Sequence, residues 1–125
     1  MKILIVEPGA HPHEADIPHT LEDMQRVVGG YIEATYPWED PVGLVCDEDG
    51  LSKNTEWNRY INKDIAIKGT FFVCGLGEED FTDLPPELME KYRKLLWNPH
   101  LFLRSPRGVR VLDMETGGVV VEISR

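Results

Sequence analysis

The sequence predicts an α+β fold with a mostly antiparallel or mixed sheet, two helices packed on one face of that sheet, and a C-terminal β-hairpin. Two observations predict this class. The chain has 125 residues and is 42% hydrophobic, which suits a single domain with a core of its own. The expected elements run strand, helix, three strands, helix and hairpin, without the strand–helix alternation of a parallel α/β sheet. We therefore expect one α+β domain over residues 1–103 and a hairpin extension over residues 104–125.

In the first half of the chain, short apolar runs are separated by turn signals. The expected strands cover residues 2–6, 31–36 and 42–46. The first is continuously apolar, as in an interior strand, whereas the second alternates between apolar and polar positions. Thr20 is a typical helix N-cap, and Gly29 with Gly30 forms a typical helix stop. We therefore expect a helix between them.

In the second half, glycines and prolines mark the boundaries of the elements. A strand is expected over residues 69–75, and hairpin strands over 109–114 and 119–123, after a short extended piece at 101–103. Asp83 is the expected N-cap of a second helix, because Pro85 and Pro86 are tolerated only in a first helical turn. Residues 51–66 show no clear period, so no element is assigned to them.

The net charge of −9 is concentrated near the N-terminus. Residues 1–50 contain 11 acidic and two basic residues, while the rest of the chain contains 11 of each. Strong acidity disfavours direct binding of nucleic acid or of anionic membranes, because both need clustered Lys and Arg. No apolar run approaches the roughly 20 residues of a membrane span or the core of a signal peptide. We therefore expect a cytoplasmic protein that contacts neither nucleic acid nor membrane directly.

Acidic residues gather in the expected loops around residues 36–50. The candidate interaction surface consists of Trp38, Glu39, Asp40, Asp47, Glu48 and Asp49. Loop carboxylates keep a protein soluble; as a group they also suit recognition of a basic protein or a nucleic-acid-processing enzyme. Trp38 either anchors such a partner or packs onto the sheet. The leading hypothesis is a non-enzymatic interaction module.

The alternative hypothesis is a metal-binding protein or metal-dependent enzyme. Its candidate ligands are His11, His13, Asp16 and His19. Imidazole and carboxylate suit zinc or nickel, and a His-x-His spacing on an extended segment directs both rings to one side. However, no helical His-Glu-x-x-His or Cys-x-x-Cys motif accompanies them, and a proline separates the first two histidines. We therefore expect no cofactor and keep the metal site as the alternative.

Nucleophilic catalysis is not indicated by the sequence. Cys46 and Cys74 each fall within an apolar strand, where burial raises the thiol pKa and keeps the sulfur unreactive. The chain contains no Gly-x-Ser-x-Gly nucleophile motif. No catalytic residue is therefore proposed from the sequence.

Several segments together carry a family resemblance. They are Glu7-Pro8-Gly9, residues 21–33, the loop Tyr36–Pro41, Asp47-Glu48 with Gly50, Asn58-Arg59, and residues 69–72. With these segments the chain resembles, over about residues 1–103, a family of small uncharacterised proteins with a domain of unknown function. The family is common on phages, plasmids and other mobile elements of Gram-positive bacteria. The resemblance implies a setting in which proteins modulate host machinery, and it supplies no catalytic residue.

Two further expectations concern structure. Arg59 is expected to pair with a strand carboxylate such as Glu33. The exposed strands of the terminal hairpin, which lie outside the family pattern, would allow a homodimer.

Overall fold

The structure is a computed structural model that describes residues 1–124. Its centre is an antiparallel sheet with the strand order β2-β1-β7-β4-β3, and a short β8 pairs with β7. These strands are β1 (Lys2–Val6), β2 (His13–Asp16), β3 (Ile32–Thr35), β4 (Val42–Asp47), β7 (Phe71–Leu76) and β8 (Phe81–Thr82). The expected α+β class is confirmed.

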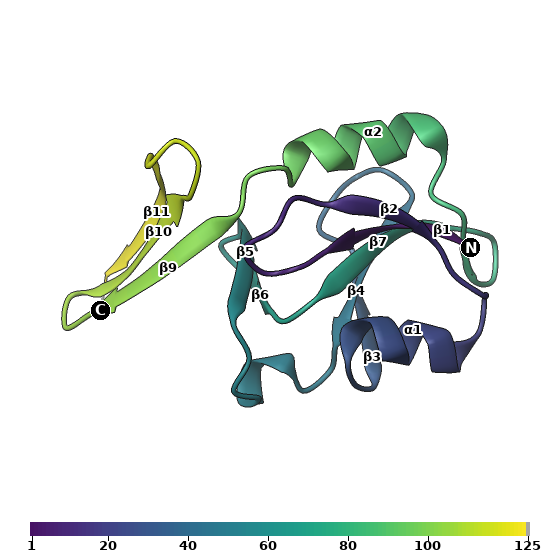
Figure 1. Ribbon diagram of the computed structural model, residues 1–125, viewed down its shortest axis with the longest axis horizontal. Coiled ribbons are helices and arrows are strands. Elements are labelled where there is room, and N and C mark those ends of the chain that lie inside the picture. The colour runs from purple at the N-terminus through teal and green to yellow at the C-terminus, as the bar shows by residue number, and fades with distance from the viewer. Residues whose placement is uncertain (125) are drawn as a thin grey trace.

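The two helices, α1 (Leu21–Val28) and α2 (Pro86–Leu95), lie on opposite faces of this main sheet (Figure 1). Met24 and Val28 of α1 pack with Ile3, whereas α2 packs on the face that carries Leu4. Ile3 and Leu4 are neighbours on β1 that point to opposite sides, and both are fully buried. The expectation of both helices on one face was wrong, because the interior strands are apolar on both sides and each side must be covered.

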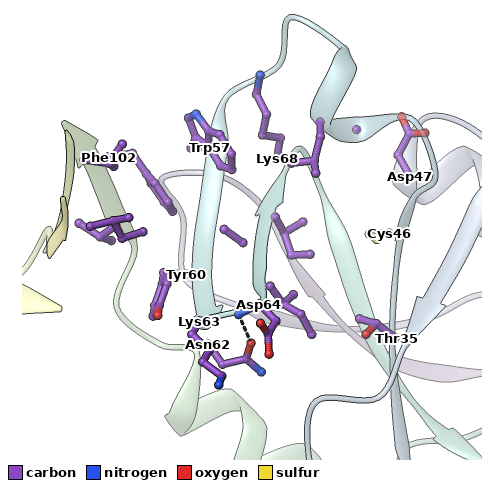
Figure 2. A pocket seen from close by; sticks show the side chains of 18 of the residues that line it. Thr35, Cys46, Asp47, Trp57, Tyr60, Asn62, Lys63, Asp64, Lys68 and Phe102 are labelled. Atoms are coloured by element: carbon purple, nitrogen blue, oxygen red, sulfur yellow. Dashed lines mark hydrogen bonds between the residues drawn. The ribbon is translucent and has the colours of Figure 1, made fainter. Parts of the chain in front are cut away.

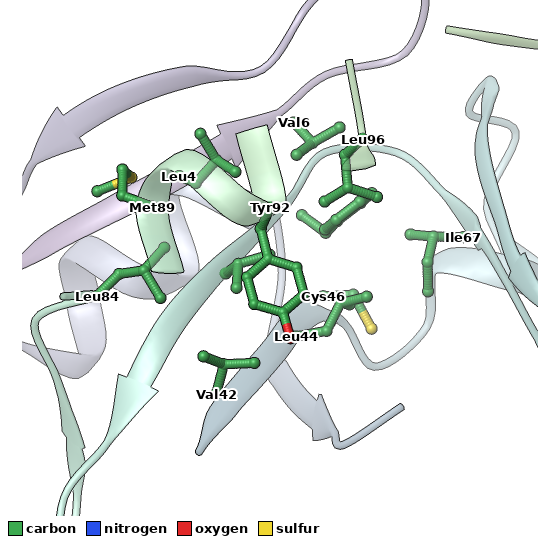
Figure 3. Packing of buried hydrophobic residues seen from close by; sticks show 12 residues of the cluster. Leu4, Val6, Val42, Leu44, Cys46, Ile67, Leu84, Met89, Tyr92 and Leu96 are labelled. Carbon is green, nitrogen blue, oxygen red and sulfur yellow. The ribbon is translucent and has the colours of Figure 1, made fainter. Parts of the chain in front are cut away.

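The core beneath α2 is the larger of the two clusters of buried residues (Figure 3). Tyr92 of α2 is 1% exposed and lies among Val42, Leu44 and Leu96. Residues from α2, β1, β4, β6 and β7 meet there. This cluster therefore joins elements from both halves of the chain.

The capping residues predicted from the sequence are confirmed for α1, whereas the N-cap predicted for α2 was wrong. The Thr20 hydroxyl accepts a hydrogen bond from the Asp23 N–H (3.1 Å), and Gly29 closes α1 in the left-handed conformation at φ 83°. At α2 the N-cap is Pro85, and the Asp83 carboxylate instead accepts a hydrogen bond from the Lys2 N–H (2.8 Å). Asp83 therefore ties the segment before α2 to β1.

The segment without a clear period forms a short 3-10 helix, η1 (Gly50–Ser52), and a two-stranded sheet of β5 (Trp57–Asn62) and β6 (Ile65–Lys68). The β5–β6 pairing shifts register twice, between Trp57 and Arg59 and between Tyr60 and Asn62. Such irregularities interrupt the two-residue alternation on which strand prediction depends. The sequence therefore did not reveal this hairpin.

The C-terminal region is a three-stranded antiparallel sheet, which contains the expected hairpin and one further strand. Its strands are β9 (His100–Ser105), β10 (Gly108–Asp113) and β11 (Val119–Ser124). The short extended piece expected at residues 101–103 is the middle of β9, and it pairs with β10 along the full length of both strands. This sheet projects from one end of the molecule (Figure 1). No helix described for residues 1–124 is long and apolar enough to cross a membrane.

Candidate functional site

A groove of about 560 Å³ lies between the β5–β6 hairpin and the C-terminal sheet and extends toward β3 and β4. Figure 2 shows Trp57 and Phe102 at one end and Thr35, Cys46 and Asp47 at the other. The groove thus combines surfaces from three separate parts of the chain. A volume of this size is typical of sites that hold a small molecule or a few side chains of a partner.

One end of the groove is aromatic and apolar. The rings of Trp57 and Phe102 stack with their centroids 5.0 Å apart and their planes at 19°. Tyr60 from β5 and Val111 from β10 extend this surface, and Val111 is fully buried. The Lys68 ammonium lies 5.3 Å from the Trp57 ring centroid and donates a hydrogen bond to the Lys53 carbonyl (3.1 Å). Lys68 is therefore already held by contacts within the protein.

The other end of the groove is rich in carboxylates. Over the whole groove, the acidic lining residues are Glu33, Asp47, Glu48 and Asp64, and the basic ones are Lys63, Lys68 and Arg104. Asp47 is 8% exposed; it pairs with Lys53 (2.5 Å) and accepts a hydrogen bond from the Asp49 N–H (2.9 Å). Glu33 and Glu48 are exposed and form no ion pair within residues 1–124. Their charges remain available to a partner.

Two fully buried polar residues of β5 hold this hairpin against the rest of the molecule. The Asn58 amide donates to the carbonyls of Val6 (2.9 Å) and Gly69 (2.8 Å). The Arg59 guanidinium donates to the Leu96 carbonyl at the end of α2 from Nε (3.1 Å) and Nη2 (2.9 Å). Its Nη2 also donates to the Ala10 carbonyl (2.6 Å). Asn58 and Arg59 therefore position the hairpin wall of the groove.

The expected pairing of Arg59 with Glu33 was wrong. Arg59 bonds backbone carbonyls and the Asn58 side-chain oxygen, whereas Glu33 lies exposed on β3. The carbonyl at a helix C-terminus carries partial negative charge and has no partner within the helix, so it suits a buried cation. Burial lowers the pKa of Arg59 to about 10, which still leaves it charged at neutral pH.

The acidic surface expected around residues 36–50 is split between the two ends of β4. Trp38, Glu39 and Asp40 precede this strand, and Asp47, Glu48 and Asp49 lie at or beyond its end. An extended strand of this length separates the two groups by about 17 Å. Of the six residues, only Asp47 and Glu48 line the groove. The two loops do not converge, because one strand runs between them.

Trp38 and Asp40 both contact side chains of α2. The Trp38 ring lies 4.6 Å from the Tyr92 ring between centroids, and Trp38 packs against the core beneath α2. The Asp40 carboxylate accepts hydrogen bonds from the Lys91 ammonium and the Tyr92 hydroxyl, both at 2.6 Å. These bonds lower the pKa of Asp40. Of the two alternatives for Trp38, the structure therefore supports packing onto the core.

The candidate metal ligands each contact a different partner. His11 pairs with Glu115, His13 lies 3.7 Å from Glu7, Asp16 binds the amino group of Met1 at 3.1 Å, and His19 lies 3.3 Å from Asp80. His11 also stacks on Trp97, with the ring centroids 4.0 Å apart. Nowhere in residues 1–124 do three His, Cys, Asp or Glu side chains gather so that they could hold a metal ion. The structure does not bring the four candidate ligands together.

Both cysteines are buried free thiols. Burial raises the pKa of Cys46 to about 11 and that of Cys74 to about 12. Both thiols are thus protonated at neutral pH, as expected from their positions within apolar strands. Although Cys46 lines the groove, it offers no thiolate nucleophile there.

The sequence contained only a weak signal for this groove. Trp57 and Tyr60 are aromatic residues in the segment 51–66, which shows no clear period and to which no element was assigned. Phe102 lay in a short extended piece, and nothing in the local pattern linked it to Trp57. Their contact depends on how the C-terminal sheet is placed.

Comparison with known proteins gives one match. The family described as Domain of unknown function (DUF3846) matches residues 1–96. No curated protein and no solved structure matches the chain. The family match covers the hairpin wall and the carboxylate end of the groove, and it ends before β9 begins at His100. The wall formed by the C-terminal sheet lies outside the matched residues.

Proposed function

The chain belongs to the DUF3846 family, and from that premise we propose that it is a non-enzymatic interaction module that binds a basic protein through the groove. One observation carries the proposal. The same groove contains a stacked aromatic pair, Trp57 with Phe102, and two exposed carboxylates without ion-pair partners among residues 1–124, Glu33 and Glu48.

The groove chemistry favours a segment that presents both basic and apolar side chains. A lysine or arginine of the partner would meet Glu33 and Glu48, and an apolar side chain would pack on Trp57 and Phe102. Aromatic surfaces supply much of the binding energy at interfaces, while charges mainly set specificity and association rate. The net charge of −9 also attracts basic partners over a distance.

Nucleic-acid-binding proteins are the partner class that these properties favour. Their phosphate-binding surfaces are rich in Lys and Arg, so an acidic groove is complementary to them. Burial raises the pKa of both cysteine thiols, so neither supplies a thiolate nucleophile at neutral pH. The interaction surface proposed here differs from the sequence hypothesis, since it keeps Asp47 and Glu48 and omits Trp38, Glu39, Asp40 and Asp49.

Calorimetric titration with a synthetic peptide of alternating Lys and Leu tests this proposal. We expect binding that weakens as salt rises, and no binding of the corresponding Glu–Leu peptide. The double variant Glu33→Gln, Glu48→Gln should weaken binding about tenfold, because two favourable charges are lost.

The matched control is the double variant Glu39→Gln, Glu78→Gln, which removes two exposed acids outside the groove lining. It should bind like the unmodified protein. Equal weakening in both double variants would mean that the peptide senses only net charge, and that result would reject the groove as the binding site. Absence of any binding to the Lys–Leu peptide would also reject the proposal.

A further inference from the structure

The free edge of β6 lies inside the groove. All four residues of this strand, Ile65–Lys68, line the groove, whereas β3 and β9 contribute only alternate residues. Four consecutive lining residues indicate that β6 presents its backbone edge and not only one face. Within residues 1–124, β6 pairs with β5 alone. Figure 2 shows Trp57 on one side of β6 and Thr35, Cys46 and Asp47 on the other.

The hydrogen bonds of β5 fix the direction of the backbone groups at Ala66. Ala66 lies opposite Tyr60 in the β5–β6 pairing, and the Tyr60 N–H donates to His100 Nδ1 of β9 (3.1 Å) and not to β6. In an antiparallel pair, two opposite residues either bond to each other or both direct their N–H and C=O groups outward. The N–H and C=O of Ala66 are therefore directed toward the free edge of β6. No loop backbone in residues 1–124 bonds to them.

The open part of this edge is centred on Ala66, because η1 closes the other end of the strand. A Cβ atom on Gly50 of η1 would lie 3.2 Å from the Lys68 carbonyl oxygen. Edge lysines discourage pairing with a further strand. The one lysine of β6, Lys68, lies at the closed end, where its ammonium donates to the Lys53 carbonyl. The edge at Ala66 is thus left free to accept a strand.

We propose that the basic partner segment binds in the groove as an added strand, with its backbone hydrogen-bonded to the N–H and C=O of Ala66. This inference rests on the proposed function and specifies its binding mode. Strand addition gains affinity from main-chain hydrogen bonds and specificity from alternate side chains. The exposed carboxylates of Glu33 and Glu48 favour a lysine-containing occupant. A second copy of this chain is disfavoured, since each copy carries a net charge of −9.

Backbone methylation of the Lys–Leu peptide tests this binding mode with the unmodified protein. In an extended strand, the N–H groups of alternate residues face the same edge. Methylating every leucine nitrogen therefore blocks one edge of the peptide, and methylating every lysine nitrogen blocks the other. In calorimetric titration we expect one methylated peptide to bind at least about tenfold more weakly and the other to bind like the parent peptide. Equal affinity of all three peptides, or equal loss in both methylated ones, would overturn the proposal.

Ala66→Pro removes the donor on the protein side. Proline is tolerated on an edge strand where the N–H faces outward, so the fold should persist, which urea denaturation checks. Binding of the parent peptide should weaken about tenfold. Ala34→Pro is the matched control, on the edge strand β3 but outside the groove lining. The Glu48 N–H donates to the Tyr31 carbonyl (2.8 Å), and the alternation from that pair directs the Ala34 N–H outward as well.

Amide hydrogen exchange measures the proposed contact directly. In saturating parent peptide, the Ala66 N–H should exchange at least about tenfold more slowly, while the Ala34 N–H should keep its rate. Unchanged exchange at Ala66 would overturn the proposal, and so would equal weakening of binding in Ala34→Pro and Ala66→Pro. Those results would leave binding in the groove intact. Failure of the parent peptide to bind would instead reject the proposed function, and this inference with it.

Discussion

The main sheet and the C-terminal sheet differ in how many of their faces are covered. In the main sheet, α1 and α2 cover opposite faces, and Ile3, Leu4 and Phe72 are fully buried. In the C-terminal sheet, Val111 on the face toward the groove is fully buried, whereas Leu101 and Leu103 on the other face are 42% and 43% exposed. Burial of apolar surface is the main favourable contribution to the free energy of folding. The stability of the C-terminal sheet therefore depends more on a few individual contacts than the stability of the main sheet does.

Besides the pair of His11 with Glu115, three contacts near β9 and β10 attach the C-terminal sheet to the remainder. They are the stack of Phe102 on Trp57, the hydrogen bond from the Tyr60 N–H to His100, and the hydrogen bond from the Asn98 amide to Asp113 (2.8 Å). One wall of the groove therefore belongs to a firmly packed body and the other to an attached sheet. The shape of the groove is therefore set by its less firmly held wall.

The largest effect is expected at Arg59, within the firmly packed body. Arg59→Met keeps an apolar stem but removes the donors to the Leu96 and Ala10 carbonyls, which then stay buried without partners. We expect the free energy of unfolding to fall by about 3 kcal/mol or more, measured by urea denaturation. Arg26→Met is the control, because Arg26 is exposed and should change stability by less than about 0.5 kcal/mol. A small loss at Arg59 would mean that the hairpin is held mainly by apolar packing.

An intermediate effect is expected at Phe102, confined to the attached sheet. Phe102→Ala removes the stack on Trp57 and should cost about 2 kcal/mol locally, less than for a fully buried phenylalanine. Hydrogen exchange should then speed up in β9–β11 while β1, β4 and β7 keep their protection. Leu103→Ala, next in the chain but on the exposed face, should leave exchange nearly unchanged. Loss of protection throughout the molecule would show that the two sheets unfold as one unit.

The smallest change in stability is expected from the protonation of His100, which lies on β9 of the C-terminal sheet. Burial lowers the pKa of His100, and nearby Arg59 lowers it further, while Asp113 opposes them. The unfolded chain thus takes up this proton at higher pH than the folded chain does. Neutral His100 therefore makes a contribution to the free energy of unfolding. This contribution is fully present above about pH 6.5 and is lost as the pH falls through the lowered pKa of the folded state. Protonation would also remove the acceptor of the Tyr60 N–H bond.

Hydrogen exchange in β9–β11 between pH 7 and pH 5 measures this effect, after correction for the intrinsic pH dependence of exchange. The attached sheet should lose protection on acidification, and His100→Gln should reduce that dependence because its amide oxygen does not titrate in this range. An unchanged pH dependence in His100→Gln would show that His100 is not the group responsible.

Elements with strong local signals could be predicted from the sequence. Helix α1 follows from its Thr20 cap and glycine stop, and β1, β4 and β7 from their apolar runs. The β5–β6 hairpin could not be predicted, because its two register shifts interrupt the alternation. Of the candidate site, the carboxylates Asp47 and Glu48 were anticipated, whereas Trp57 and Phe102 were not.

The sequence by itself determined the α+β class, the bounds of α1, the burial of both cysteines and the net charge of −9. These properties depend on neighbouring residues or on composition. Only the tertiary structure decided that Trp38 packs on Tyr92, that Phe102 stacks on Trp57, and that Arg59 binds carbonyls in place of Glu33. Each of these depends on contacts between segments that are distant in the chain, and periodicity and capping carry no information about which distant segments meet.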